Sequence, residues 1–266
     1  VPYTMRNPLY HWTHMELSRV FGINTILKPE TAREIYDACT AMLHTEEFRA
    51  QNIMKRFNVE VVCTTDDPAD SLEHHIYLKN NPIGIKVYPA WRPDKALGID
   101  NPATYKAYME KLGEAAGIEI RSYTDLLTAL RRRHDFFASL GCRLSDHGMD
   151  NFYADDFTET EVNRVFNKVM EGHTPDAAEV SLFRSALLYE LAIMDWEKGW
   201  AQQYHISVVR NSSTRMYRML GPDTGFDAIM EVNCSVAGHR FFDRLDREGK
   251  LTKTILYSLN PKDNEV

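Results

Sequence analysis

The sequence lacks the segments that mark membrane, secreted and nucleic-acid-binding proteins. It contains no run of about eighteen apolar residues, and its first residues, VPYTMRNPLYHW, lack the basic and apolar regions of a signal peptide. Lysine and arginine are scattered and the formal net charge is −7, so no basic surface for nucleic acid or an anionic membrane is expected. These absences predict a soluble cytoplasmic protein whose partners are small molecules or proteins, with a homo-oligomer left open.

Cysteine is also sparse. The chain contains four, at Cys39, Cys63, Cys142 and Cys234. No C-x-x-C pair indicates a zinc or thiol-redox site, and the wide spacing is not typical of a disulfide-rich domain. We therefore interpret all four as reduced thiols.

Five short apolar runs rich in β-branched residues predict buried strands. They are VEVVCTT from Val59, IGIKVYPAW from Ile83, CRLSDHG from Cys142, HISVVRN from His205 and KTILYSLNP from Lys253. Segments with helical periodicity lie between them, and Thr158 with Glu161 forms a capping box ahead of one such segment. Strands that alternate with helices predict an α/β fold with a parallel sheet.

Polar residues cluster at the carboxyl ends of the predicted strands, in the motifs DDP, WRPD, SDHG and VVRN. The active sites of (β/α)8 barrels are assembled at this edge of the sheet. An open doubly wound sheet binds ligands there too, but usually through a glycine-rich phosphate turn, and the sequence has neither G-x-G-x-x-G nor a P-loop. We therefore predict a TIM barrel in residues 56–266, preceded by a helical insertion in residues 1–55.

Asp146 and His147 are the first candidates for catalysis. They follow a predicted strand and precede Gly148. A carboxylate and an imidazole at a strand end can transfer protons or bind a metal. In the structural alternative, Asp146 caps the next turn and His147 is a hydrogen-bonded polar residue. The position at the strand end favours function.

Three further residues, His205, Arg210 and Arg92, have the chemistry of a proton-transfer or anion-binding site. His205 opens the predicted strand HISVV and Arg210 lies five residues later. This odd offset points the two side chains to opposite faces of an extended strand, unless the strand kinks or one of the residues lies in a loop. Arg92 precedes a proline, which holds it in an extended or turn conformation from which its guanidinium can bind a carboxylate. Ion pairing for the arginines and core packing for His205 are the structural alternatives.

Several motifs together resemble those of the uronate isomerases, a family of the amidohydrolase superfamily. They are NPLYHWTHMEL, VVCTTDDP, YPAWRPDK, LSDHG, the block HISVVRNSSTRMYRMLGPDTGFD, and TILYSLNPKDN. They occur in the family's order and span nearly the whole chain, so their combination is far more specific than any one of them.

The resemblance implies a (β/α)8 barrel of the metal-dependent hydrolase type and an aldose–ketose isomerase of bacterial hexuronate catabolism. The expected reactions interconvert D-glucuronate with D-fructuronate and D-galacturonate with D-tagaturonate. They require a base near C2, stabilisation of an enediolate oxygen and a cationic group for the C6 carboxylate. Matched onto the family's motifs, Arg92 and Arg210 are expected to bind the anion. Asp146, His147 and His205 are expected to transfer protons or orient hydroxyls.

The sequence departs from the family pattern in its metal ligands. The resemblance implies a divalent metal, zinc or another ion, held by an H-x-H motif in the first strand and an aspartate in the last. No H-x-H triplet occurs in the 266 residues, and the aspartate is expected beyond Val266. With Val1 as the first residue, we expect a barrel without its first and last strands. Such a barrel has open edges and cannot close, so we predict weak or no activity for this chain alone.

Two other functions fit the same residues. A metal-dependent hydrolase of the same superfamily would use a metal-activated water to attack an ester, amide or lactone. A non-catalytic sugar-acid-binding protein would use the arginines to bind and would turn nothing over. Proton exchange with solvent without consumption of water distinguishes isomerisation from hydrolysis, and uronate binding without turnover would indicate the binding protein.

Overall fold

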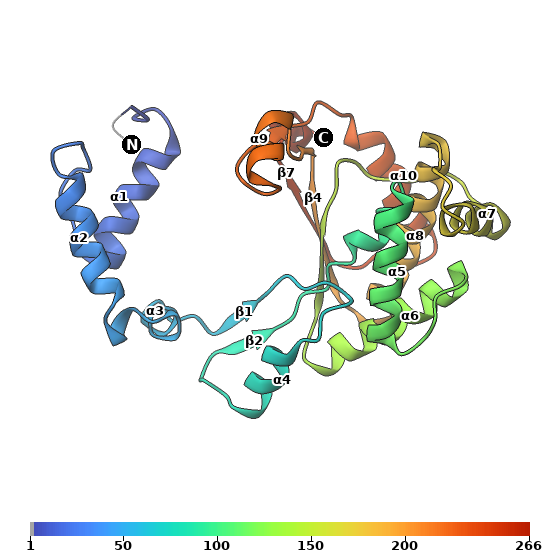
Figure 1. Cartoon of the computed structure of the whole chain (residues 1–266), viewed down its shortest axis with the longest axis horizontal. Coiled ribbons are helices and arrows are strands. Elements are labelled where there is room, and N and C mark those ends of the chain that lie inside the picture. The colour runs from blue at the N-terminus through green and yellow to red at the C-terminus, as the bar shows by residue number, and fades with distance from the viewer. Residues whose placement is uncertain (1–2) are drawn as a thin grey trace. The chain divides into compact units, whose positions relative to one another are not determined.

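Helices and strands alternate along most of the chain in the computed structural model, which describes residues 3–266 (Figure 1). The helices are α1 (Pro8–Phe21), α2 (Ala32–Leu43), α3 (Ala50–Arg56), α4 (Glu73–Asn80), α5 (Pro102–Ala116), α6 (Tyr123–Ser139), α7 (Glu159–Met170), α8 (Ala177–Lys198), α9 (Thr214–Leu220) and α10 (Cys234–Arg247). The strands are β1 (Val61–Cys63), β2 (Lys86–Tyr88), β3 (Leu144–Gly148), β4 (Ala201–Ile206), β5 (Val208–Val209), β6 (Ala228–Ile229) and β7 (Thr254–Ser258). Three short 3-10 helices are η1 (Glu46–Phe48), η2 (Asp94–Leu97) and η3 (Pro261–Glu265). Among the described helices, none has the length and apolar character needed to cross a bilayer.

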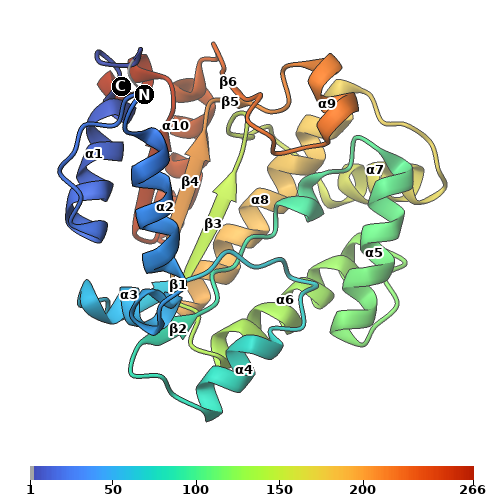
Figure 2. The ribbon, with the colours of Figure 1, turned by 60° about the vertical axis from the view of Figure 1, so that its left-hand side comes forward.

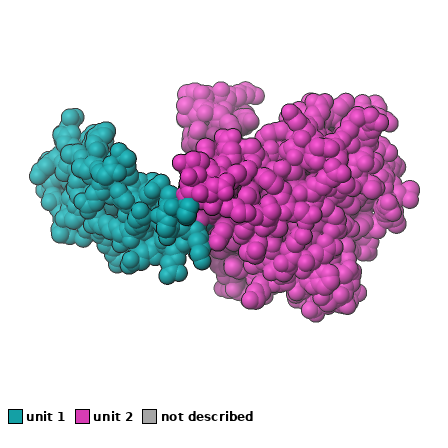
Figure 3. All heavy atoms as spheres, turned by 90° about the horizontal axis from the view of Figure 1, so that it is seen from below, with its two compact units in different colours: residues 1–62, 82–86 teal, residues 63–81, 87–266 magenta. Residues whose placement is uncertain are grey.

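The chain divides into two compact units, shown in different colours in Figure 3. The smaller unit is residues 1–62 with 82–86, and the larger is residues 63–81 with 87–266. The smaller unit contains α1, α2 and α3. The domain boundary predicted between residues 55 and 56 stays a prediction, and the expectation about Val1 concerns a residue outside the described range.

Side-chain caps fix where the helices of the larger unit begin. Thr158 accepts a hydrogen bond from the Glu161 N–H, and the Glu161 carboxylate accepts one from the Thr158 N–H, which confirms the predicted capping box of α7. Ser122 begins α6 and Asp176 begins α8 by the same reciprocal arrangement. Each cap satisfies backbone donors that a helix start leaves without a partner and contributes about 1 kcal/mol.

A parallel sheet forms the centre of the larger unit. Strands β3, β4 and β7 pair in parallel and in that order, with Gly148 opposite His205 and His205 opposite Tyr257. Parallel bridges from Asp66 to Trp91 and from Trp91 to Ser145 join the segments after β1 and β2 to β3. The parallel segments thus follow one another in chain order. The predicted α/β fold with a parallel sheet is confirmed.

The boundaries predicted for the fourth strand are wrong. The prediction placed His205 at its start, but β4 begins at Ala201 and has His205 as its second-last residue. The side chains of AQQYHI alternate between more and less buried positions, as expected of a strand. Because three of the six residues are polar, the sequence does not show this alternation as alternating hydrophobicity. Ser207, at φ 71°, then breaks the extended backbone, so Val208 and Val209 belong to a separate strand, β5, which pairs with β6 in antiparallel fashion.

The hydrophobic core lies between the helices and one face of the sheet. Figure 2 shows β3 and β4 side by side, with α8 running beside them. Phe137 of α6, Phe183 of α8 and Phe241 of α10 are almost fully buried, and the ring of Tyr204 on β4 packs edge-on against Phe241. Burial of each phenylalanine contributes about 1.5–3 kcal/mol. This packing holds β3 and β4 against the helices, and the carboxyl ends of these strands carry the candidate site residues.

A buried polar network anchors the same face of the sheet to α6 and α8. The carboxylate of Asp195 accepts hydrogen bonds from Ser145 Oγ at 2.7 Å and Gln202 Nε2 at 3.2 Å, and it lies 3.0 Å from His134 Nε2. Asp195 and His134 are nearly inaccessible to solvent. Burying a carboxylate costs free energy unless hydrogen-bond donors contact it. These contacts therefore favour one position of β3 and β4 relative to the helices.

Candidate active site

The side chains of β3 alternate between two faces of the sheet. Ser145 and His147 face the helices, where Ser145 bonds to Asp195 and the His147 ring stacks on Tyr204 at 5.0 Å. Asp146 therefore points to the opposite face. The two adjacent candidates, Asp146 and His147, are placed on different sides of the strand.

Arg92, Asp146 and His205 form a cluster on the face opposite the helices. Arg92 lies on this side because its neighbour Trp91 packs edge-on against Phe137 of α6. Arg92 Nη1 is 3.3 Å from Asp146 Oδ2, and His205 Nε2 is 3.0 Å from Asp146 Oδ1. The structure thus brings three of the five predicted site residues into direct contact around one carboxylate.

One oxygen of Asp146 lacks a hydrogen-bond donor. Asp146 Oδ1 is buried and accepts no hydrogen bond from any described residue, because the nearby His205 nitrogen approaches it from an unsuitable direction. Buried carboxylate oxygens are normally satisfied, so this atom can receive a hydrogen bond from a bound ligand. His205 itself is about half exposed, and its ring stacks on Tyr257 at 4.4 Å.

Asp94 links Arg92 to His147. Its Oδ1 lies 3.1 Å from His147 Nδ1, and its Oδ2 accepts from the Gly148 N–H at 2.7 Å and from Arg92 Nε at 3.1 Å. Burial raises the pKa of the Asp94 carboxyl, but the hydrogen bond and charge of His147, the Gly148 N–H and Arg92 outweigh it, and the pKa is lowered overall. Asp94 is therefore ionised at neutral pH.

Arg210 lies apart from the Arg92 cluster, in the segment that follows β5. Its Nη1 forms a 2.6 Å ion pair with Asp227 Oδ2, and Asp227 Oδ1 accepts the Asn211 N–H at 3.0 Å. The Asn211 N–H and the Arg210 guanidinium together lower the pKa of the Asp227 carboxyl. About half of the Arg210 side chain is exposed, so it can exchange this partner for an anionic ligand.

A cavity of about 370 Å³ lies next to this cluster at the strand ends. Asp94, Gly148, Arg184 and Arg210 contribute to its wall, whereas Arg92, Asp146 and His205 are not among its lining residues. Arg184 is held by Tyr153 and Asp100, whereas Arg210 is the more exposed of the two arginines. A volume of this size accommodates a small organic acid.

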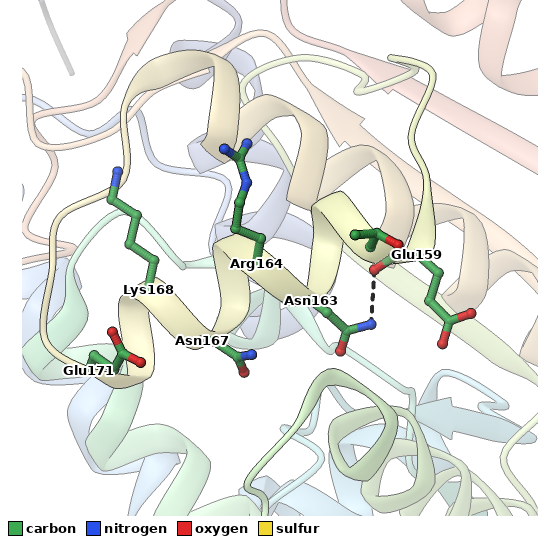
Figure 4. A pocket seen from close by; sticks show the side chains of 7 residues that line it. Glu159, Asn163, Arg164, Asn167, Lys168 and Glu171 are labelled. Carbon is green, nitrogen blue, oxygen red and sulfur yellow. Dashed lines mark hydrogen bonds between the residues drawn. The ribbon is translucent and has the colours of Figure 1, made fainter.

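A larger hollow of about 680 Å³ lies on the outer face of α7 and lacks the features of a site. Figure 4 shows that the side chains drawn there, among them Asn163, Arg164 and Lys168, project from this single helix. Asn163 donates to the Glu159 carbonyl, and Lys168 is paired with Glu179. Side chains of one solvated helix face do not converge on a ligand, so the smaller cavity at the strand ends is the candidate site.

The residues present do not complete a metal centre. No group of three or more His, Cys, Asp or Glu side chains is arranged to hold a metal ion within residues 3–266. Asp146 Oδ1 and His205 Nε2 offer two ligand atoms, whereas a catalytic zinc ion normally takes three from the protein. We therefore assign no step of the proposed reaction to a metal.

Comparison with known proteins decides the family. The family model described as glucuronate isomerase matches residues 1–266. The chain belongs to the glucuronate isomerase family. A protein of Phocaeicola vulgatus named uronate isomerase is 55% identical over 266 residues, which are all of this chain and 57% of the relative. The resemblance predicted from the motifs is confirmed, and the chain spans a little over half the length of the curated relatives it matches.

Solved structures of glucuronate and uronate isomerases share the fold. The crystal structure of uronate isomerase from Thermotoga maritima matches with a TM-score of 0.91 and 31% identity, over 98% of this chain and 57% of that one. Glucuronate isomerase from Caulobacter crescentus matches with a TM-score of 0.88 and 30% identity, over 97% of this chain and 53% of that one. The arrangement of β3, β4 and β7 is thus that of the family.

Two acidic residues of the site were not predicted from the sequence. Asp94 stands in the WRPD motif, two positions after Arg92, and an acidic residue in a motif at a strand end was a usable signal. Asp227 offers no such signal, because its contact with Arg210 depends on the pairing of β5 with β6, which are only two residues long.

Proposed function

We propose that the protein is a uronate isomerase that interconverts D-glucuronate with D-fructuronate and D-galacturonate with D-tagaturonate. The observation that carries the proposal is the buried Asp146 carboxylate, with one oxygen free of donors and with Arg92 and His205 in contact, in a chain of the glucuronate isomerase family. Such a carboxylate suits a base that takes a proton from carbon.

The reaction is balanced without a second reactant. The C2–H bond breaks, a C1–H bond forms, and a proton moves from the O2 hydroxyl to O1, so an enediolate is the intermediate. We propose that Asp146 and His205 exchange these protons, because their reactive atoms are 3.0 Å apart and Oδ1 of Asp146 can accept one. His147 is buried on the other face of β3, where its Nδ1 lies 3.1 Å from Asp94 Oδ1, and its role in proton transfer or in orienting a hydroxyl stays a prediction.

The arginines are proposed to bind the carboxylate of the substrate and to stabilise the negative charge of the intermediate. Arg92 already contacts two carboxylates, Asp94 and Asp146, so its positive charge is largely compensated. Arg210 has one carboxylate partner, is half exposed and lines the cavity. We therefore assign the C6 carboxylate to Arg210, with Arg92 fixing Asp146 and supporting the enediolate oxygen.

The proposal extends to the fold and the cofactor. The parallel segments follow chain order without the reversal of an open doubly wound sheet, which supports an arc of a (β/α)8 barrel of the metal-dependent hydrolase type. A divalent metal ion, zinc or another, is expected in the complete site from the superfamily, in addition to the residues described above.

Substrate comparison and one variant test the function. The protein at its full natural length is assayed with D-glucuronate, D-galacturonate and the neutral sugar D-glucose, and ketose formation is followed by chromatography. We expect turnover of a uronate, little with D-glucose, and a loss of about 10²–10⁴-fold in kcat for Asp146→Asn. Equal turnover of D-glucose would contradict the assignment of a carboxylate site, and full activity of Asp146→Asn would contradict its role as base.

A further inference from the structure

The carboxylate of Asp94 contacts two of the proposed site residues at once. Arg92 Nε donates to Oδ2 at 3.1 Å, and His147 Nδ1 lies 3.1 Å from Oδ1. The Gly148 N–H, at 2.7 Å from Oδ2, fixes the carboxylate against the end of β3. Asp94 thus connects the segment after β2 with β3 where both enter the candidate site.

These contacts determine the orientation of both partners. An ionised carboxylate only accepts hydrogen bonds, so His147 must carry its proton on Nδ1. The hydrogen bond to Arg92 Nε sets the plane of the guanidinium, and in that plane Nη1 reaches Asp146 at 3.3 Å. Arg92 Nη2 lies over Gly148, in space that any side chain at position 148 would occupy.

The position of Asp94 is unfavourable for binding an acid. Asp94 lines the same cavity as Arg210, so its negative charge repels an anionic ligand there. We propose that Asp94 is a positioning residue of the isomerase, which holds Arg92 and His147 in their working orientations at some cost in substrate affinity. The inference rests on the proposed function and adds a residue to which no role was assigned.

Asparagine at position 94 tests the proposal because it keeps the size of the side chain but removes its charge and one acceptor. In the protein at its full natural length, we expect Asp94→Asn to lower kcat by about 10²-fold, since displacement of a catalytic group by about 1 Å costs that much. We expect KM to stay equal or fall, because the repulsion of the substrate anion is removed. Asp156→Asn is the matched control: it breaks an exposed 2.7 Å pair with Arg244 away from the site and should change neither constant.

The second readout is the protonation of the His147 ring, followed by ¹⁵N NMR. We expect a protonated Nδ1 in the wild type and a changed pattern in Asp94→Asn, because the amide group can donate to Nδ1. A wild-type spectrum with an unprotonated Nδ1 contradicts the proposal even if the variant does not fold. So does a folded Asp94→Asn variant whose kcat is within about twofold of the wild type.

The two hypotheses fail in different ways. If the wild type turns over no uronate, the proposed function fails, and the His147 spectrum still decides whether Asp94 positions the ring. If the wild type is active but Asp94→Asn retains both its kcat and its His147 spectrum, the function stands and the positioning role is refuted.

Discussion

Alanine in place of Gly148 should disable the site while leaving the fold intact. A Cβ atom at position 148 would lie 2.2 Å from Arg92 Nη2 but 3.6 Å from Asp94 Oδ2, which is an ordinary contact. Ordinary contacts begin near 3.4 Å, so the guanidinium must move by about 1.2 Å while Asp94 can stay. That displacement is enough to break the 3.3 Å pair between Arg92 and Asp146.

The expected magnitude follows from this displacement. A misplacement of about 1 Å near the chemistry costs about 10²-fold, so kcat/KM of Gly148→Ala should fall by that factor, or about 2.7 kcal/mol of transition-state stabilisation. The free energy of unfolding should change by about 1 kcal/mol or less, because the end of Arg92 is a third exposed and can turn toward solvent. Steady-state kinetics and urea unfolding measure the two quantities.

Gly238→Ala is the control with the opposite expectation. Its Cβ would lie 3.0 Å from Cδ2 of Phe152, a buried ring, so this variant should lose about 1–3 kcal/mol of stability and keep its kcat/KM. A Gly148→Ala variant with wild-type kcat/KM would show that the Arg92–Asp146 contact is dispensable for activity, contrary to the role proposed for it.

Three further variants test the buried network, the anion-binding role of Arg210 and the ionisation of Asp94. Asp195→Ala leaves buried donors without an acceptor and should cost about 3–5 kcal/mol in urea unfolding, and a loss below 1 kcal/mol would contradict the buried network. Arg210→Gln should raise the KM for uronates about 10–100-fold with less effect on kcat, since a charge-assisted hydrogen bond contributes about 1.5–3 kcal/mol. Because the pKa of Asp94 is lowered below 3.8 in the folded state, its stabilisation is present above that pH and is lost as the pH falls further. The stability difference between wild type and Asp94→Asn should therefore be constant at pH 5–7 and shrink below about pH 4. A difference that grows below pH 4 would contradict a lowered pKa for Asp94.

The sequence predicted the elements whose signals are local. Strands β1, β2, β3 and β7 lie inside their predicted apolar runs, and the capping box at Thr158 begins α7 as expected. Strand β4 was misplaced because its buried face contains Gln202, whose burial depends on the Asp195 network in three dimensions. Local hydrophobicity cannot report a polar residue that is buried by distant partners.

The candidate site was predicted as a set of residues but not as a geometry. Placement at strand ends accounts for the contact of Arg92 with Asp146, because parallel strands in register align their carboxyl ends. His205 was predicted at the start of its strand and joins them because it lies near the carboxyl end of β4. It did not reveal that Asp146 and His147 separate onto two faces, nor that Asp94 reconnects them through Arg92. The position of Arg210 depends on the β5–β6 pairing and on Asp227, which the sequence pattern does not indicate.

Isomerase activity is measured by proton NMR of the protein at its full natural length in deuterated water, with D-glucuronate and D-galacturonate. Zinc or manganese is added, and a chelated sample is the control. We expect ketouronate signals and deuterium at the carbon that receives the proton, as an enediolate exchanging with solvent requires. Absence of reaction with both sugars under every metal condition would contradict the isomerase, and ketouronate without deuterium would contradict an enediolate whose transferred proton exchanges with the solvent.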